Sequence, residues 1–275
     1  MRVDSHHHFW DPERRQYPWM DAELAPIRRR FGPEDLGPLL MASEIDKTVL
    51  VQTISSVDET REFLAVAAQS EFIAGVVGWV DLADPAVAGT IAKLQSEVGG
   101  DRLAGVRHQV HDEPDANWLL RAEVNRGIAR VGDAGLVYDL LVRTRELPAA
   151  LETVTRHRHM QFVIDHAAKP RIAGGSWDAA WEKALAPFSD HANVACKLSG
   201  LVTEADWQAW RPEQLEPYVT RVIGWFGAER CMFGSDWPVC LLAATYPEVV
   251  TTMREIVGED HQVFGDTAAL VYDLR

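Results

Sequence analysis

Two histidines near the start of the chain, His6 and His8, are separated by a single residue. Side chains two positions apart on a strand point to the same side, so a strand here would direct both imidazoles to one point and turn His7 away. Other polar pairs follow apolar runs at Arg107-His108, Tyr138-Asp139, Asp165-His166 and Ser235-Asp236. Two or three imidazoles with a carboxylate suit a divalent metal such as zinc with a position open for water. The pattern therefore predicts a metal or catalytic site.

These residues must be positioned by regular elements, and short β-rich runs recur along the whole sequence, each followed by a segment of helical composition. The runs begin at intervals that average about 32 residues, a period that suits a strand–helix unit. They are continuously apolar, as in parallel strands covered on both faces. We expect strands at Val3 to His6, Lys47 to Gln52, Phe72 to Val80, Leu103 to Arg107, Leu136 to Leu141, Met160 to Asp165, Asn193 to Leu198 and Arg230 to Gly234.

Amphipathic segments between these runs predict the helices, at Thr60 to Ser70, Ala86 to Val98, Trp118 to Val131 and Pro217 to Phe226. Eight such units in about 250 residues predict an α/β fold of the (β/α)8 TIM-barrel type. A doubly wound open sheet is the second choice, because no GxGxxG follows the first strand. The stretch from Phe9 to Asp46 is expected to form an extended first loop with an amphipathic helix. No linker composition interrupts the chain, so residues 1–275 are predicted to be a single domain.

Charge and composition exclude several classes of protein. The 275 residues are 47% hydrophobic and 25% charged, and the net charge of −14 disfavours binding to nucleic acid or an anionic membrane. No segment approaches 18 uncharged apolar residues, and no signal peptide is recognisable. Three cysteines without CxxC spacing indicate a reducing compartment, so we expect a cytoplasmic protein. The sequence does not fix the oligomeric state, and a homo-oligomer is compatible with it.

Four motifs stand in order at the expected strand ends: Asp4-Ser5-His6-His7-His8-Phe9-Trp10, Gly105-Val106-Arg107-His108, Val163-Ile164-Asp165-His166-Ala167-Ala168-Lys169-Pro170 and Phe233-Gly234-Ser235-Asp236-Trp237-Pro238. In these motifs the chain resembles the amidohydrolase superfamily, of the amidohydrolase 2 type. Within it, the chain is similar to the sugar-lactonase group that contains L-fuconolactonase and L-rhamnonolactonase. The likeness covers essentially the full length. It implies a TIM barrel, a hydrolytic water, and metal ligands or their remnants at His6, His8, His166 and Asp236.

The resemblance also includes a departure. Many binuclear amidohydrolases bridge two metals with a carboxylated lysine at the end of strand four, where this chain has Arg107-His108. The resemblance therefore implies at most one divalent metal, with zinc as the first choice. Members of the sugar-lactonase group resemble one another in holding this metal weakly or in working without it.

The reaction that the resemblance implies is the hydrolysis of an aldonolactone such as L-fucono-, L-rhamnono- or L-galactonolactone to the free acid. Asp236 would take a proton from water and return it to the ring oxygen. His166 would complete the metal shell or stabilise the oxyanion, and both roles stay open. Without a metal, Arg107 and His108 are the candidate electrophiles. Asp165 is expected to point into the barrel wall.

We expect substrate contacts from side chains near the strand ends or in the first loop: Trp10, Tyr17, Gln52, Arg107 and Trp237. Trp19 and Trp79 are further aromatic candidates for holding a sugar ring. A buried core position is the competing interpretation for any single tryptophan, and a solvated strand end is the competing one for Gln52. We expect His111 to lie in a surface loop, and the sequence assigns no role to Lys169.

Three other functions compete with lactone hydrolysis. Related barrels with the same HxH and a strand-eight Asp are metal-dependent, non-oxidative decarboxylases of aromatic or unsaturated acids. A barrel without activity that binds sugar acids or a protein is less favoured, because all four motif groups are present. A metal-dependent nuclease is disfavoured by the net charge and by the lack of a basic stripe.

Overall fold

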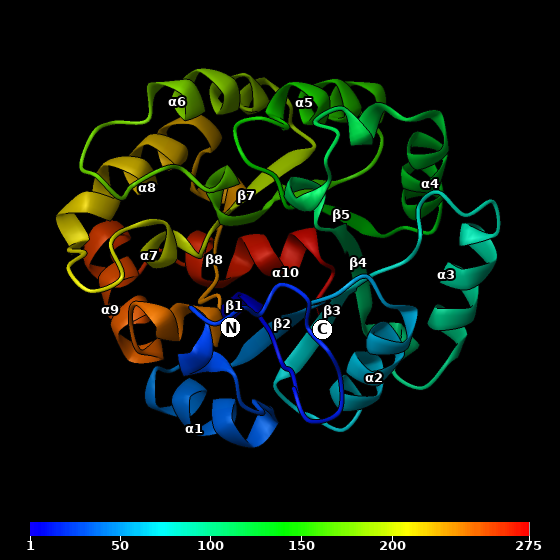
Figure 1. Cartoon of the computed structure of the whole chain (residues 1–275), viewed down its shortest axis with the longest axis horizontal. Helices are drawn as coiled ribbons and strands as arrows, with labels where there is room; N and C mark the ends of the chain where they lie inside the picture. Colours follow the sequence, from blue (N-terminus) through cyan, green and yellow to red (C-terminus); the bar gives the residue numbers. More distant parts are fainter. Residues whose placement is uncertain (275) are drawn as a thin grey trace.

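Eight parallel strands form one sheet in the order in which they occur along the chain. Figure 1 shows this arrangement in the computed structural model, which describes residues 1–274. The strands are β1 (Val3–His7), β2 (Lys47–Val51), β3 (Ile73–Gly78), β4 (Leu103–His108), β5 (Val137–Leu140), β6 (Phe162–Ile164), β7 (Val194–Leu198) and β8 (Cys231–Phe233). Each expected strand overlaps an observed one, and the predicted (β/α)8 TIM barrel is confirmed.

Helices surround the strands, as Figure 1 shows. They are α1 (Pro33–Ala42), α2 (Val57–Ala67), α3 (Val87–Ser96), α4 (Ala122–Asp133), α5 (Leu147–Arg156), α6 (Ala179–Leu185), α7 (Leu201–Glu204), α8 (Pro212–Phe226), α9 (Tyr246–Val257) and α10 (Thr267–Val271). Side-chain oxygens cap several of them, since Ser56 accepts from the backbone of Glu59 and Thr245 from that of Glu248. α8 begins at Pro212, because a proline in the first turn of a helix gives up no hydrogen bond.

The inside of the barrel changes from apolar to charged along the strands. Val137, Val163 and Ala195 belong to a buried apolar cluster that also includes Ala268 and Tyr272 at the C-terminal end of the chain. Two positions further along their strands, and so on the same face, come Asp139, Asp165 and Lys197, all buried. The apolar layer thus supports a polar layer nearer the carboxyl ends of the strands, where barrel active sites lie.

The first and last strands meet at a seam that closes the barrel. The backbone N–H of Asp236 donates to the carbonyl of His6 at 2.8 Å. The buried carboxylate of Asp4 accepts from the backbone N–H of Ser235 at 2.8 Å and from the hydroxyl of Tyr246 at 3.1 Å. Burial raises the pKa of Asp4 to about 6, although these hydrogen bonds oppose the shift. The seam therefore brings the histidine motif of β1 beside the carboxylate that follows β8.

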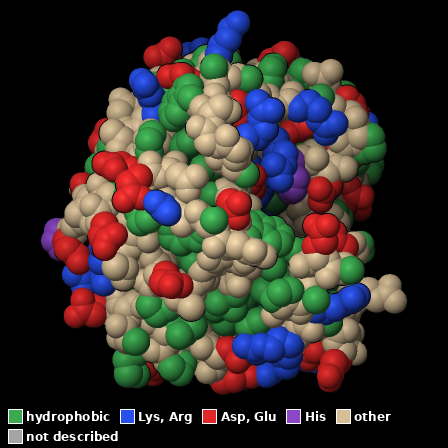
Figure 2. All heavy atoms as spheres, turned by 60° about the vertical axis from the view of Figure 1, so that its left-hand side comes forward, with side chains coloured by type: hydrophobic (Ala, Val, Ile, Leu, Met, Phe, Trp, Pro, Cys, Tyr) green, Lys and Arg blue, Asp and Glu red, His purple; other side chains and the backbone are tan. Residues whose placement is uncertain are grey.

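The segment between β1 and β2 forms the extended first loop, with a short 3-10 helix (Ala25–Ile27) and α1. An antiparallel bridge between Trp10 and Phe31 ties this loop to itself. Among residues 1–274, no helix is long and apolar enough to cross a membrane. On the face drawn in Figure 2, acidic and basic side chains are interspersed, and no continuous basic stripe is visible.

Candidate active site

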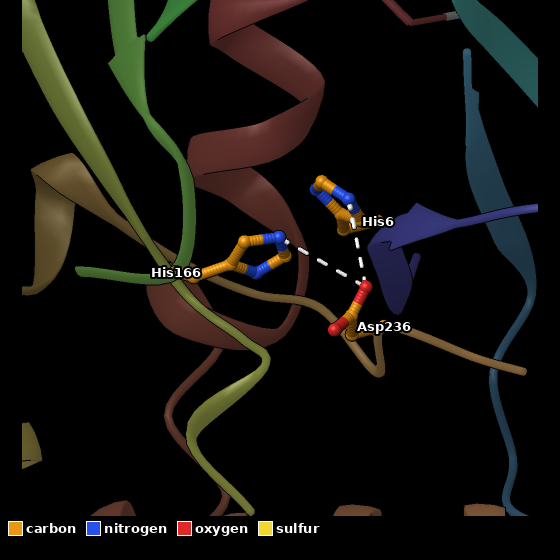
Figure 3. A group of neighbouring side chains, drawn as sticks. All are labelled: His6, His166 and Asp236. Atoms are coloured by element: carbon orange, nitrogen blue, oxygen red, sulfur yellow. Dashed lines mark ion pairs between the residues drawn. The ribbon is translucent and has the colours of Figure 1, made fainter. Parts of the chain in front are cut away.

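Three buried side chains from distant parts of the chain converge at the carboxyl ends of the strands, as Figure 3 shows. His6 lies on β1, His166 follows β6, and Asp236 follows β8. Asp236 Oδ1 lies 3.8 Å from His6 Nε2 and 3.9 Å from His166 Nε2. One potential ligand atom from each residue lies within 4.8 Å of the others.

His8 joins this group from the same strand as His6. Its Nε2 lies 3.4 Å from Asp236 Oδ1 and 3.2 Å from His6 Nε2. Its Nδ1 lies 2.8 Å from the carbonyl oxygen of Val51, which can only accept, so the proton of a neutral His8 is on Nδ1. The lone pair on Nε2 therefore faces the carboxylate and the other imidazole.

The donor set fits one divalent cation. Tetrahedral zinc with bonds of about 2.0–2.1 Å holds its ligand atoms about 3.3 Å apart, close to the separations seen here. Burial, the largest cause, lowers the pKa of His6 and of His166 well below the ordinary value, so both are neutral, as ligation requires. Asp165 lies 3.3 Å from His6 Nδ1, and Ser199 lies 2.8 Å from His166 Nδ1. Such partners orient metal-binding imidazoles in known sites.

Unusual backbone holds two of these side chains in place. Residues 166–169 all have left-handed conformations, with φ between 48° and 58°, and Asp236 has φ 57°. For residues other than glycine this conformation costs about 1–2 kcal/mol each. The turn is held by Trp181, whose indole N–H donates to the carbonyl of Ala167 at 2.6 Å. Strain of this kind is concentrated at functional sites.

A glycine on the loop after β7 makes room for the cluster. Gly200 has φ 63°, and a Cβ there would lie 2.6 Å from His166 Nδ1 and 3.0 Å from Asp236 Oδ2. Any side chain would push these two residues apart. The sequence analysis did not single out Gly200, because a lone glycine after a strand carries no specific signal.

Below the cluster lies a set of buried charged side chains with one tyrosine, which we call the interior charge network: Arg107, Asp139, Asp165, Lys197 and Tyr272. Lys197 Nζ lies 2.6 Å from Asp139 and 3.0 Å from Asp165. Arg107 Nη1 lies 3.0 Å from Asp165, and the hydroxyl of Tyr272 donates to Asp139. Although burial opposes it, the charges of Lys197 and Arg107 and the neighbouring imidazole of His6 hold the pKa of Asp165 well below its usual range.

Asp165 corrects an expectation, because it points into the barrel rather than into its wall. It occupies the inward position that follows Val163 by two residues. Lys197, which the sequence analysis did not mention, could have been found in the same way, since it is a charge at an inward position of an otherwise apolar strand.

A cavity of about 200 Å³ opens above the cluster. Its catalytic side is formed by His8, Arg107, His166 and Asp236. The rest of its wall comes from Trp10, Trp19, Leu24, Ile27, Thr53, Gln109, His111, Asp112, Leu141, Lys169, Val239 and Leu242. His111 therefore does not lie in a plain surface loop as expected, because the loop after β4 folds over the cavity.

Of the five expected substrate contacts, Arg107 and Trp10 line this cavity. Gln52 is fully buried, and its side chain donates to the backbone carbonyl of Arg107 at 3.3 Å. Trp237 is buried in the core against Phe31, and neither it nor Gln52 reaches the cavity wall. Tyr17 lines a separate cleft of about 170 Å³ beside the first loop.

His108 also lies away from the cluster. Its ring stacks on Trp118 at 4.1 Å, its Nδ1 accepts from the indole N–H of Trp79 at 3.0 Å, and its Nε2 lies 2.9 Å from Glu113. Successive strand residues point to opposite faces, so Arg107 enters the barrel and His108 leaves it. Of this pair, Arg107 therefore lies beside the cluster, with Nη1 3.3 Å from His6 Nε2.

Comparison with known proteins agrees with this geometry. A family model described as Amidohydrolase matches residues 3–274. The chain is 39% identical over 289 aligned residues to an L-fucono-1,5-lactonase of Burkholderia multivorans, which covers all of this chain and 96% of the relative. It is 42% identical over 247 residues to an L-fucono-1,5-lactonase of Burkholderia ambifaria, covering 89% of this chain and 83% of the relative.

Solved structures extend the comparison. A crystal structure of an amidohydrolase from Burkholderia multivorans with bound zinc superposes with a TM-score of 0.94 at 38% identity, and each chain is fully covered. A 2,6-dihydroxybenzoate decarboxylase from Rhizobium shares the fold with a TM-score of 0.68, but only 12% identity over 99% of this chain and 98% of the other. From its family match, its relatives and its barrel, the chain belongs to the amidohydrolase family.

Proposed function

We propose that this chain is a hydrolase that opens a sugar-acid lactone, with L-fucono-1,5-lactone or a close aldonolactone as substrate. The relatives at 39% and 42% identity bear the name of this activity. The observation that carries the proposal is the convergence of His6, His166 and Asp236, of which His166 and Asp236 line a cavity. A water molecule there would have a base, a cationic neighbour and space for an ester carbonyl.

Asp236 is the general base. Burial alone would raise the pKa of its carboxyl, but the neighbouring imidazoles of His166 and His8 and the positive charge of Lys169 outweigh burial and lower it. Asp236 is therefore ionised in neutral solution and accepts the proton of the attacking water. The same proton returns to the ring oxygen as the carbon–oxygen bond breaks, and such transfers contribute about 10²- to 10⁴-fold.

Arg107 stabilises the negative charge that develops on the carbonyl oxygen. Its guanidinium is buried, lines the cavity and lies 3.3 Å from His6 Nε2. A guanidinium keeps its charge at every physiological pH, so it can assist without a proton transfer. His166 lies on the same side of the cavity and either binds the metal or donates to this oxygen.

His6, His166 and Asp236, with His8 beside them, would hold one divalent metal, for which imidazole and carboxylate ligands favour zinc. When bound, such an ion lowers the pKa of a water and polarises a carbonyl. Arg107 stands where many binuclear amidohydrolases have a bridging lysine, so we propose no second metal.

The decarboxylase alternative is not favoured. The relatives near 40% identity are lactonases, whereas the decarboxylase structures share the fold alone. For the cellular setting, we propose that residues 1–275 work as one domain in the cytoplasm on a small molecule, in keeping with the net charge of −14. The unpaired, buried cysteines Cys196, Cys231 and Cys240 support a reducing compartment.

The test is a pH-indicator assay on a panel of sugar lactones, with and without chelator, together with elemental analysis of the purified protein. We expect acid release from L-fucono-1,5-lactone and from fewer of its stereoisomers. The matched control offers 2,6-dihydroxybenzoate and measures carbon dioxide. Carbon dioxide release without any lactone hydrolysis would overturn the proposal.

A further inference from the structure

Two polar atoms in the cavity wall are buried and have no hydrogen-bond partner among the described residues: Trp19 Nε1 and His111 Nδ1. The third such atom in this wall, Arg107 Nε, belongs to the catalytic side. Roughly 90% or more of buried polar groups in native proteins are partnered. A buried polar atom without a partner, on a side chain that lines a cavity, calls for a partner that comes with the ligand.

The indole of Trp19 is held rigidly on the first loop. Its ring packs edge-on against Trp10, with centroids 5.3 Å apart, and against Tyr17 at 6.2 Å. An indole N–H can only donate, so Trp19 offers the cavity one fixed donor.

His111 offers the complementary group, an acceptor. Its backbone N–H donates to Leu141 at 3.2 Å, and its Nε2 lies 3.3 Å from the carboxylate of Asp112. With its proton on Nε2, facing this carboxylate, a neutral His111 keeps the lone pair on Nδ1. Burial first, and then the positive charges of Lys169, Arg143 and Arg107, lower the pKa of His111 to about 3. The imidazole is therefore neutral in neutral solution and keeps this lone pair.

Other polar side chains of the wall are already engaged. Gln109 Nε2 donates to the carbonyl of Thr53 at 2.8 Å, and Lys169 Nζ pairs with Glu204 at 2.7 Å. Leu24, Val239 and Leu242 offer no hydrogen bond at all.

We propose that Trp19 and His111 form a subsite for the ring hydroxyls of the lactone, in which Trp19 donates to one hydroxyl oxygen and His111 accepts from a hydroxyl proton. A hydroxyl both donates and accepts, so a polyhydroxylated ring satisfies both atoms, whereas an alkyl ring leaves both unpaired. The two residues determine specificity and take no part in proton transfer. This inference rests on the proposed lactone hydrolysis and adds that Trp19 and His111 recognise the ring hydroxyls of the substrate.

The experiment compares kcat/KM for L-fucono-1,5-lactone and for analogues in which one ring hydroxyl at a time is replaced by hydrogen. The variants are Trp19→Phe, His111→Leu and His111→Asn. For the full lactone, we expect a loss of about 10- to 100-fold in Trp19→Phe and His111→Leu. His111→Asn places a polar atom close to the former Nδ1 and should recover most of the rate. For at least one analogue, a variant and the wild type should be equal within about threefold, because the lost contact is already absent.

The controls are Trp177→Phe and His159→Leu, at exposed positions outside the cavity wall, which should match the wild type. An equal loss for the full lactone and for every analogue would overturn the subsite while leaving lactone hydrolysis intact. The same holds if His111→Asn were as slow as His111→Leu. A wild-type protein that hydrolyses no lactone would overturn the proposed function itself, and the subsite with it.

Discussion

The interior charge network and the cavity wall are both buried and polar, but their polar groups differ in how they are paired. In the network, the charged groups form ion pairs, since Lys197 contacts two carboxylates and Arg107 contacts one of them. In the wall, Trp19 Nε1 and His111 Nδ1 are buried and have no hydrogen-bond partner among residues 1–274. The difference separates two uses of buried polarity: groups satisfied within the chain fix a shape, and groups left unsatisfied select a ligand.

The cluster of His6, His8, His166 and Asp236 combines both uses. The Nδ1 atoms of His8 and His166, which point away from the centre of the cluster, lie within hydrogen-bond distance of Val51 and Ser199. The Nε2 atoms of His6 and His8 and the carboxylate of Asp236 are the inner atoms, which lie 3.2–3.8 Å from one another. We therefore expect catalysis to depend on the inner atoms, and the stability of the fold to depend on groups that are hydrogen-bonded or paired within the chain.

The largest effect on activity should come from replacing the carboxylate of Asp236, one of the inner atoms of the cluster. Asp236→Asn preserves the shape of the side chain but removes the base, so kcat should fall by about 10²- to 10⁴-fold while the protein stays folded. Steady-state kinetics and circular dichroism measure the two effects. Asp101→Asn, at an exposed position, is the control. A variant within tenfold of the wild type would exclude Asp236 as the base.

Replacing a charge that is paired within the chain should instead reduce the stability of the fold. Lys197→Met removes the cation between Asp139 and Asp165, and breaking a buried pair costs about 3–5 kcal/mol of unfolding free energy. Urea denaturation measures the loss, and Lys93→Met on the exposed face of α3 should show none. If Lys197→Met were as stable as the wild type but inactive, the network would belong to catalysis rather than to folding.

The smallest effect concerns pH. The pKa of His111 is about 3 when folded, below the ordinary value of 6.5, so the unfolded chain binds more protons as pH falls through this window. Stability should therefore decrease from pH 6.5 towards pH 4, by up to about 1.4 kcal/mol per pH unit for one full proton. In His111→Asn this slope should be smaller. An equal slope in this variant and in the wild type would mean that folding does not lower the pKa of His111.

The fold could be predicted because each strand is an apolar run at a regular spacing, such as Phe162–Ile164. The convergence of His6 and His166 with Asp236 followed from the rule that strand ends meet at one edge. Trp237 and Gln52 were harder to place, because a motif neighbour can be part of the core as easily as part of the cavity. That Trp19 and His111 lie in the wall of one cavity could not be predicted, since nothing in a loop sequence tells how it folds over a cavity.

The seam between β1 and β8 has a consequence for any ligand of the cluster. His6 and His8 lie at the end of β1, and Asp236 follows β8. A ligand that binds to all three therefore links the first and the last strand of the barrel. Its binding energy adds to the free energy that keeps the barrel closed. Occupancy of the site should thus be readable as a rise in melting temperature, before any turnover is measured.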